Sequence, residues 1–347
     1  MQSIAIVGAG VAGLGAAYAL RDRDATVTLF ERADRVGGRS ATRRTDGYTY
    51  DTGANYLKDG DDRVTDLVTG PLSSGLVEVE GPVWTFDADG AVSPGRDEDE
   101  RKWTYEGGIA TLATRLRDAA DAAVETGTPV ERLRRASDEW VVETAMRGAP
   151  GVSDDGSAAF DDVVLTPPAP ETAALLADAE WDHPDRERIR EAAAAVPYRS
   201  ILSVALHYPA PVERPYYALV NTDREHAVGW LAREECKPGH VPDGESLLIA
   251  QMAPDWSADR FGDDDDAIAA DAARHAAALL DEDRLRSPDW TDVARWRRAL
   301  PDAGVAADAV AAARDHDLYL AGDWVAGEAR LHAALSSGLK TGERVVD

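Results

Sequence analysis

The sequence contains a single cysteine, Cys236, among 347 residues. An intrachain disulfide and a metal site built from several cysteines are both excluded. Apolar runs are also short, and none approaches the ~20 residues that cross a bilayer as a helix. No basic flank precedes the first apolar stretch, which argues against a secretory signal. We therefore expect a cytoplasmic protein that does not enter a membrane.

Positive charge is scarce, because 37 basic residues face 64 acidic ones and the formal net charge is −27. Only four of the basic residues are lysines. A surface of this charge repels phosphates, so nucleic acid and anionic membranes are poor partners. The aspartate run 263–266 is more typical of a solvated loop than of a metal site, and we predict no metal. The composition resembles that of proteins from salt-accumulating haloarchaea, where salt screens the repulsion.

Apolar residues make up 44% of the chain, and 9 Trp, 10 Tyr and 4 Phe are among them. A mostly disordered chain is therefore excluded. At ~150 residues for a domain, the length suits two domains with a substantial core.

The first thirty residues predict a nucleotide-binding unit. An apolar, β-branched run at 3–7 predicts a buried parallel strand. A glycine-rich turn and an Ala-rich helix to about residue 21 follow, and a second strand at 26–30 ends on Glu31. This order is typical of dinucleotide binding. We predict that six consecutive residues of the turn bind the cofactor: Gly8, Ala9, Gly10, Val11, Ala12 and Gly13.

Each glycine of the turn has a mechanical role. Gly8 permits the tight turn, Gly10 lets the backbone approach a pyrophosphate, and Gly13 lets the helix pack on the strand. The helix N-terminus directs free N–H groups at that pyrophosphate. Glu31 is placed to accept hydrogen bonds from a ribose. Because an acid disfavours a 2′-phosphate there, the sequence favours FAD or NAD over NADP.

A second glycine pair follows this unit. After Glu31 and Arg32 comes Gly37-Gly38-Arg39, where two glycines let the chain pass under a cofactor and Arg39 can reach pyrophosphate or flavin. In these residues the sequence resembles the flavin-dependent amine oxidase superfamily. The resemblance implies that the cofactor is FAD and that Arg32 belongs to its site. It also places three residues beside the flavin ring: Gly53, Ala54 and Asn55.

The C-terminal segment resembles the same superfamily. An apolar strand is predicted at 318–321, before Gly322-Asp323, and a helix from about His332 to 344. The resemblance assigns Asp323 to the ribityl chain of FAD. It places the helix N-terminus, at His332, against the flavin N1/C2=O edge, where it stabilises negative charge. Val130 sits where the family uses backbone groups to hold adenine.

Because the first and last segments meet at one cofactor, we expect domains that are discontinuous in sequence. The predicted fold class is α/β, with a doubly wound, Rossmann-type FAD-binding domain and a second, mixed α+β substrate domain. The FAD-binding domain takes 1–57, 105–170 and 315–347. The substrate domain takes 58–104 and 171–314.

Within the superfamily, the sequence is most similar to renalase and its bacterial relatives. The similarity rests on the short chain, on 41–44 directly after Gly-Gly-Arg, and on Trp230-Leu231 and 237–239. It implies hydride transfer from an isomeric dihydronicotinamide of the NAD(P)H type to flavin N5, with reoxidation by dioxygen to give hydrogen peroxide. Such a reaction needs no catalytic base.

The resemblance also supplies candidate substrate contacts. Tyr217 and Trp296 match segments whose aromatic side chains line the substrate site, and Tyr198 and Trp324 match less well. These aromatic residues are equally typical of core packing. His226 could bind a carboxamide or a phosphate, although a lone loop histidine is usually solvated.

Two other functions stay open from the sequence: a flavin amine oxidase, and a flavin-binding sensor or interaction protein without turnover. A desaturase-like enzyme is disfavoured, because it would need an apolar channel and membrane contact. Since Cys236 lies in a central loop and not beside the C-terminal flavin segment, we expect FAD to be bound noncovalently.

Overall fold

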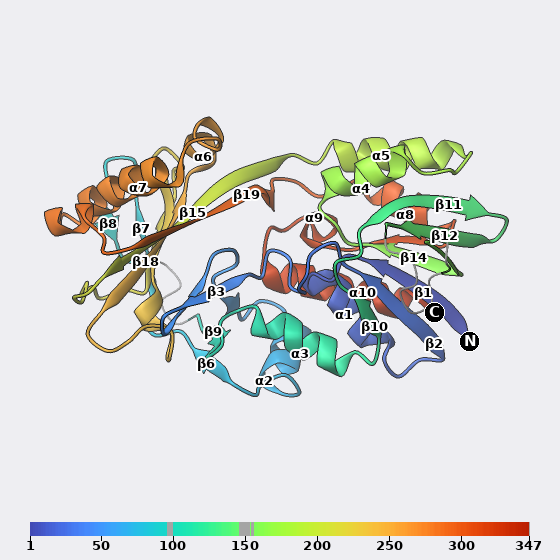
Figure 1. The fold of residues 1–347 in the computed structure, drawn as a ribbon, viewed down its shortest axis with the longest axis horizontal. Helices are drawn as coiled ribbons and strands as arrows, with labels where there is room; N and C mark the ends of the chain where they lie inside the picture. The colour runs from blue at the N-terminus through green and yellow to red at the C-terminus, as the bar shows by residue number, and fades with distance from the viewer. Residues whose placement is uncertain (96–99, 146–152, 154–155, 347) are drawn as a thin grey trace.

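The computed structural model describes residues 1–95, 100–145, 153 and 156–346. Two large sheets form its framework, and they lie toward opposite ends of an elongated molecule (Figure 1). Within the described residues, no helix is long and apolar enough to span a membrane.

The first sheet is parallel throughout, with strand order β10-β2-β1-β14-β20. Alternate side chains of its first strand enter different core clusters, with Ile4 and Ile6 on one face and Ala5 and Val7 on the other. Both faces are covered, which explains the continuous apolar runs in the sequence. The strands are β1 (Gln2–Val7), β2 (Ala25–Phe30), β10 (Ala123–Glu125), β14 (Asp162–Leu165) and β20 (Leu318–Leu320).

Helices from both ends of the chain cover one face of this sheet. The first and the last helix pack closely, because a Cβ atom on Gly338 would lie 2.0 Å from the Ala12 carbonyl oxygen. Gly342 approaches Ala16 in the same way, at 2.3 Å. The N- and C-terminal segments therefore share one core. The helices on this face are α1 (Val11–Leu20), α2 (Asp62–Thr69), α3 (Thr111–Ala119) and α10 (Leu331–Val345).

A small antiparallel sheet and three helices cover the opposite face of the parallel sheet. Apart from the first two residues of α4, the three helices lie inside the range predicted for the substrate domain, yet their apolar side chains enter the core of the parallel sheet. The domain boundaries stay a prediction. These elements are β11 (Val130–Ala136), β12 (Glu139–Thr144), β13 (Ser157–Phe160), α4 (Ala169–Ala177), α5 (Pro184–Ala194) and α8 (Ala307–Arg314).

The second large sheet has the strand order β19-β15-β18-β17-β16-β7-β8 and is mixed, because only the β16–β7 pair is parallel. Two helices cover one of its faces. Its elements are β7 (Val83–Phe86), β8 (Val92–Ser93), β15 (Tyr198–Tyr208), β16 (Ala218–Asn221), β17 (Val228–Arg233), β18 (Ser246–Met252), β19 (Thr291–Pro301), α6 (Pro254–Asp259) and α7 (Asp265–Leu279). Together, the parallel sheet and this mixed sheet confirm the predicted α/β fold class.

Smaller elements join the two sheets. A hairpin carries the chain from the glycine pair at 37–38 toward the second sheet, and a short helix follows the last parallel strand. These elements are β3 (Thr42–Thr45), β4 (Tyr48–Asp51), β5 (Leu57–Lys58), β6 (Leu76–Glu78), β9 (Lys102–Tyr105), η1 (Glu234–Cys236), η2 (Asp283–Arg286) and α9 (Asp323–Ala326).

Candidate flavin site

The glycine-rich turn between β1 and α1 has an open side. The Gly8 N–H donates to the Phe30 carbonyl at 2.8 Å, and its φ of +96° is one that glycine adopts without strain. A Cβ atom on Gly13 would lie 2.0 Å from the Gly8 carbonyl oxygen, whereas no described atom lies within 4 Å of one on Gly10. Gly10 is also the N-cap of α1 and offers no side-chain cap. The first N–H groups of α1 are thus available to an anion at that open side.

Glu31 lies at the end of β2 and is buried. Its two carboxylate oxygens accept from the backbone N–H groups of Ala9, at 2.8 Å, and Ala33, at 2.9 Å. Each oxygen keeps a second lone pair that a ribose hydroxyl can use. The N–H of Thr128 donates to the Glu31 carbonyl, which brings the start of β11, at Val130, close to the acid.

The glycine pair at 37–38 lies against this turn. The Gly37 N–H donates to the Ala9 carbonyl at 2.9 Å, and a Cβ atom on Gly38 would lie 3.5 Å from the Gly10 Cα atom. The two glycine motifs therefore form one continuous surface. Arg32, between them in sequence, is exposed.

Arg39 and Asp323 join the first and last motifs directly. The Arg39 guanidinium donates to both carboxylate oxygens of Asp323, at 2.7 and 2.8 Å, and to the Ala299 carbonyl at 3.0 Å. Burial lowers the pKa of Arg39, but the Asp323 carboxylate outweighs this effect and the pKa is raised. The sequence placed both residues at the cofactor, and the structure pairs them with each other.

The segment around Gly53 is held between the two sheets. The Ala54 N–H donates to the Arg39 carbonyl at 3.0 Å. From the mixed sheet, the Gln251 amide donates to the Gly53 carbonyl at 2.7 Å, and the Trp296 indole donates to the Thr52 carbonyl at 2.6 Å. Trp296 therefore lies beside the segment predicted to face the flavin ring.

Three aromatic rings pack together next to this segment. The centroids of Tyr56, Tyr217 and Trp230 lie 5.9–6.1 Å apart. Tyr217 is fully buried, and burial raises its pKa well above the usual value. Among the described residues, neither the Tyr217 hydroxyl nor the Trp230 indole N–H has a hydrogen-bond partner, and the Asn55 carbonyl oxygen also lacks one. These three residues and Tyr56 are called the aromatic pocket below.

Other predicted residues lie elsewhere. The His226 ring contacts Phe86 and His275, at centroid distances of 5.1 and 6.0 Å, on the face of the mixed sheet that α7 covers. Tyr217 lies on the opposite face, in a separate cluster. The structure thus does not bring His226 together with Tyr217 and Trp296.

The remaining candidates surround the last helix and the Arg39–Asp323 pair. His332 is buried in the first turn of α10, with its Nε2 atom 3.4 Å from a Glu328 oxygen. The Gly322 N–H donates to the Ser337 hydroxyl of α10 at 3.1 Å. Tyr198 has its hydroxyl 3.2 Å from the Ala169 N–H, and burial raises its pKa to about 12. Trp324 is buried and donates to a backbone carbonyl, which is a core role.

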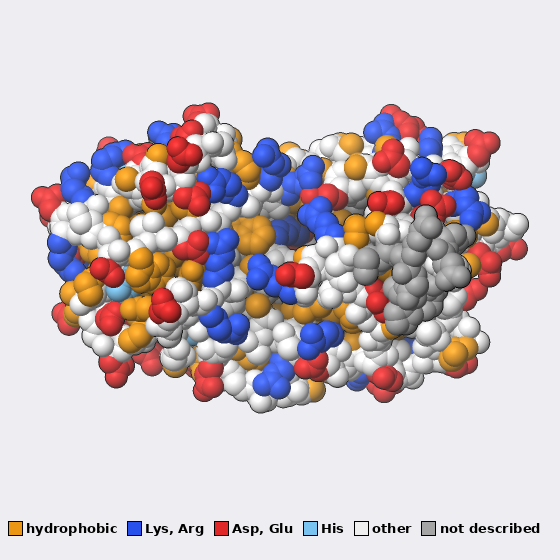
Figure 2. Space-filling view, viewed as in Figure 1, with side chains coloured by type: hydrophobic (Ala, Val, Ile, Leu, Met, Phe, Trp, Pro, Cys, Tyr) orange, Lys and Arg blue, Asp and Glu red, His pale blue; other side chains and the backbone are white. Residues whose placement is uncertain are grey.

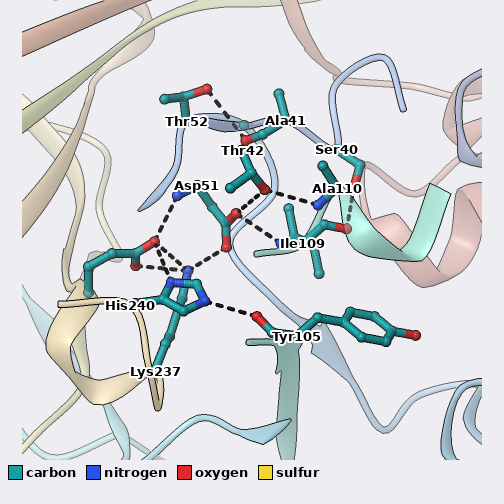
Figure 3. A network of polar contacts seen from close by, with 12 residues as sticks. Ser40, Ala41, Thr42, Asp51, Thr52, Tyr105, Ile109, Ala110, Lys237 and His240 are labelled. Atoms are coloured by element: carbon teal, nitrogen blue, oxygen red, sulfur yellow. Dashed lines mark hydrogen bonds and ion pairs between the residues drawn. The ribbon is translucent and has the colours of Figure 1, made fainter. Parts of the chain in front are cut away.

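A buried ion cluster surrounds Asp51, two residues before Gly53 (Figure 3). The Lys237 ammonium has no exposed surface and lies 2.8 Å from an Asp51 oxygen and 2.8 Å from a Glu234 oxygen. Asp51 also accepts from the Thr42 hydroxyl at 2.6 Å and from the Ile109 N–H at 2.9 Å. Burial lowers the pKa of Lys237, but the two carboxylates outweigh it and the pKa is raised. In the sequence, the segment 237–239 carries a family resemblance and no sign of this ion cluster.

The sequence matches two family models. Residues 6–70 match an NAD(P)-binding Rossmann-like domain, and residues 78–346 match the flavin containing amine oxidoreductases. The second match covers more than half of the chain. The protein belongs to the flavin containing amine oxidoreductase family.

Individual relatives of this amine oxidoreductase match over short segments. Protoporphyrinogen oxidase 2 of Arabidopsis thaliana is 43% identical over 67 residues, which are 19% of this chain and 13% of the relative. A flavin-containing monoamine oxidase AofH of Mycobacterium tuberculosis, itself assigned provisionally, is 44% identical over 66 residues, 19% of this chain and 14% of the relative. The matches span about one-seventh or less of these relatives.

Solved structures match the whole fold. Cyclohexylamine oxidase from Brevibacterium oxydans IH-35A has a TM-score of 0.74 at 17% identity, covering 99% of this chain and 98% of that one. A provisionally assigned protoporphyrinogen oxidase from Exiguobacterium sp. 255-15 has a TM-score of 0.78 at 18% identity, covering 99% and 98%. At these identities the likeness shows the fold.

The family implies a flavin cofactor, and the residues present fit FAD. The space beside Gly10, the uncapped N-terminus of α1 and the free lone pairs of Glu31 suit a pyrophosphate and a ribose. The protein is an enzyme of this flavin-containing oxidase family. Figure 2 shows Lys and Arg side chains bordering a hollow near the middle of one face.

Proposed function

We propose that this amine oxidoreductase is a renalase-like oxidase that binds FAD noncovalently. Its reaction transfers a hydride from an isomeric dihydronicotinamide of the NAD(P)H type to flavin N5, and dioxygen takes up the electrons as hydrogen peroxide. Bound FAD supplies the hydride acceptor and the route to oxygen. The chain's own residues bind the substrate, orient its ring and exclude water.

The polar atoms of the aromatic pocket carry this proposal. A buried polar atom without a partner costs ~1–3 kcal/mol, so a ligand that pairs with these atoms gains that free energy. The Trp230 indole can only donate and the Asn55 carbonyl oxygen can only accept, whereas the Tyr217 hydroxyl can do both. A carboxamide offers an acceptor and N–H donors on one planar group. A protonated amine offers donors only, so the pocket favours a nicotinamide.

A group of arginines, one of which acts on Tyr56, supports a substrate with phosphate groups. The pKa of Arg199 is lowered, mainly by burial. The nearby Asp302 carboxylate raises this pKa, whereas the positive charges of Arg224 and Arg330 lower it further. Arg199 thus feels the positive charge of both Arg224 and Arg330. Arg330 also acts on the pocket itself, because it opposes the burial that raises the pKa of Tyr56. Three arginines in a chain of net charge −27 suit the pyrophosphate of a dinucleotide.

The residue roles follow the geometry. Tyr217 packs against the substrate and hydrogen-bonds it, while Trp296, held by the Thr52 carbonyl, shields the flavin face. His226 takes no part, because its ring lies on the other face of the mixed sheet. We assign the following residues to FAD, with the Asn55 side chain also contacting the substrate: Gly8, Ala9, Gly10, Val11, Ala12, Gly13, Glu31, Arg32, Gly37, Gly38, Arg39, Gly53, Ala54, Asn55, Val130, Gly322, Asp323 and His332.

We also propose that the enzyme works in the cytoplasm at high salt. Its net charge of −27 produces strong self-repulsion in dilute buffer. Concentrated salt shortens the screening length to ~3 Å at 1 M and removes most of this repulsion. Stability that rises steeply with KCl concentration is the expected result.

The test is an anaerobic visible spectrum of the FAD-loaded protein in concentrated KCl, before and after adding mixed-isomer NADH. Rapid bleaching of the flavin bands, with peroxide on admitting air, is the expected result. Trp230→Phe should slow the bleaching. Trp84→Phe is a matched control, because its indole also lacks a partner but packs against the core on the opposite face of the sheet.

An amine oxidase is the second candidate, favoured by the fold likeness to cyclohexylamine oxidase. Flavin that bleaches with an amine but not with isomeric NADH would replace the first proposal with this one. Flavin that no donor reduces above background would indicate a non-catalytic flavin-binding protein.

A further inference from the structure

Two histidines and an aspartate from distant segments meet outside the flavin site. His183 is the N-cap of α5, Asp185 lies in the first turn of that helix, and His316 lies between α8 and β20. One Asp185 oxygen, Oδ2, is 3.0 Å from His316 Nε2 and 3.5 Å from His183 Nδ1. One ligand atom from each of the three residues lies within 4.8 Å of the other two.

These distances match the spacing of ligands around a metal ion. Zinc binds imidazole nitrogen and carboxylate oxygen at ~2.0–2.1 Å, and tetrahedral angles then place two ligand atoms about 3.3 Å apart. The two distances to the Asp185 oxygen lie on either side of this value. Two imidazoles and one carboxylate are also a common ligand set for divalent transition metals.

The imidazole of His183 is in the form that binds a metal. Its Nδ1 atom accepts a hydrogen bond from the Asp185 backbone N–H at 3.2 Å, so this nitrogen carries no proton, and a bound ion would take its one lone pair in place of that hydrogen bond. All three side chains are partly exposed. An ion can therefore enter from solvent, and water can complete its coordination.

Tryptophans fix the two rings before any ion binds. Trp181 is stacked on His183, with centroids 5.7 Å apart and planes 10° apart, and meets His316 edge-on at 5.0 Å. The Trp140 indole donates to the His316 carbonyl at 2.9 Å. Because the side chains are already ordered, an ion pays little entropy to bind them.

Among the described residues, the surrounding arginines do not engage the shared oxygen, which accepts a hydrogen bond from the His316 ring that a bound ion would replace. Arg188 is 3.6 Å from Asp185, but it approaches the other carboxylate oxygen, Oδ1, and also pairs with Asp308 at 2.7 Å. The positive end of the α5 dipole opposes a cation here, so the three direct ligands must outweigh it. A second group, Asp51, Glu234 and His240, differs because the Lys237 ammonium already lies between its carboxylates.

We propose that His183, Asp185 and His316 bind one divalent transition-metal ion of the Zn²⁺ class. The ion would tie α5 to the segment that enters β20, the strand that leads to Gly322 and Asp323. Its role is structural, and it does not depend on the proposed oxidase reaction.

The experiment is a calorimetric titration of tag-free, chelator-treated, FAD-loaded protein with Zn²⁺ alone. One ion per chain is expected, with affinity reduced at least ~10-fold in both His183→Ala and His316→Ala. His275→Ala is the control, because that half-buried histidine also lies beside an aspartate, Asp271, outside any such group of three in the described chain. Its Zn²⁺ affinity should equal that of the unmodified protein.

A second probe guards against variants that misfold. Asp185→Asn keeps the shape of the side chain, and it should weaken Zn²⁺ binding while the flavin spectrum and FAD content stay unchanged. Zn²⁺ should also raise the thermal midpoint of the unmodified protein, because the ion binds the native state. No binding by the unmodified protein, or equal binding by His183→Ala and His316→Ala, would overturn the proposal. Neither result bears on the oxidase reaction.

Discussion

Removing the buried ammonium of Lys237 should destabilise the protein severely. In Lys237→Met, the carboxylates of Asp51 and Glu234 lose the cation that lies 2.8 Å from each of them, and none of the three side chains has exposed surface. Breaking a buried ion pair by removing one partner typically costs ~3–5 kcal/mol, because the remaining charge stays in a low-dielectric site. A loss of this size is a large part of the ~5–15 kcal/mol that stabilises a typical domain.

The assay is urea unfolding of the FAD-loaded protein in concentrated KCl, followed by tryptophan fluorescence. Lys340→Met is the matched control, since this lysine is more than half exposed and lies 3.9 Å from Asp61. An exposed pair of this kind is worth ~0–1 kcal/mol. Equal unfolding free energies for the two variants would refute the reasoning. A triple variant that combines Lys237→Met with Asp51→Asn and Glu234→Gln has no uncompensated carboxylate in the cluster. It should therefore be more stable than Lys237→Met alone.

The contribution of the buried Lys237 cluster to the free energy of unfolding also depends on pH. Burial raises the pKa of Glu234, but Lys237 outweighs it and the net shift is downward from the usual 4.5. Its stabilisation is therefore present above pH 4.5 and is lost as the pH falls through the lowered value. The pKa of Lys237 is raised from 10.5, so its stabilisation is present below pH 10.5 and is lost at higher pH. The free-energy difference between the unmodified protein and Lys237→Met should be largest between these limits.

Three further variants test other parts of the structure. Gly10→Ala should fold normally but lose FAD, because its methyl group enters the open space where the phosphate binds. Gly13→Ala should lose FAD and also be less stable, because its methyl group would lie 2.0 Å from the Gly8 carbonyl oxygen. The thermal midpoint measures the stability of each variant, and flavin absorbance measures its FAD content. Tyr217→Phe should reduce the rate of flavin bleaching by isomeric NADH about tenfold, the effect of one lost hydrogen bond of ~1.4 kcal/mol, without lowering stability. An unchanged bleaching rate would contradict the pocket assignment. Burial raises the pKa of Asp162 to about 6 from 3.8, so Asp162→Asn should gain stability over the unmodified protein as the pH rises from about 4 to 6, measured by urea unfolding at several pH values.

The nucleotide-binding unit could be predicted from sequence because its signals are local. The run predicted as a strand at 3–7 is β1, at Gln2–Val7, and the predicted helix and second strand follow as α1 and β2. The glycine-rich turn is recognisable in the sequence because a backbone position with positive φ, such as Gly8, strongly favours glycine. The strand predicted at 318–321 and the helix predicted from about 332 to 344 correspond to β20 and α10. Both could be predicted because the hydrophobic pattern of a strand or a helix repeats within a few residues.

Tertiary structure decided which side chains meet. Arg39 bonds Asp323 across 284 positions, and no local pattern encodes that pairing. The aromatic pocket likewise joins Tyr56 to Trp230 in β17 and to Tyr217, which directly precedes β16 in the mixed sheet.

The histidines show the same limit. His226 has a plausible chemistry for a substrate site, but it lies in the loop between β16 and β17, and its ring packs on the face of the sheet opposite Tyr217. His183 and His316 carried no metal signal because they are far apart in sequence. The chain's local patterns determine its cofactor unit, whereas topology and strand register determine which residues form the substrate pocket, the buried ion cluster and the proposed metal site.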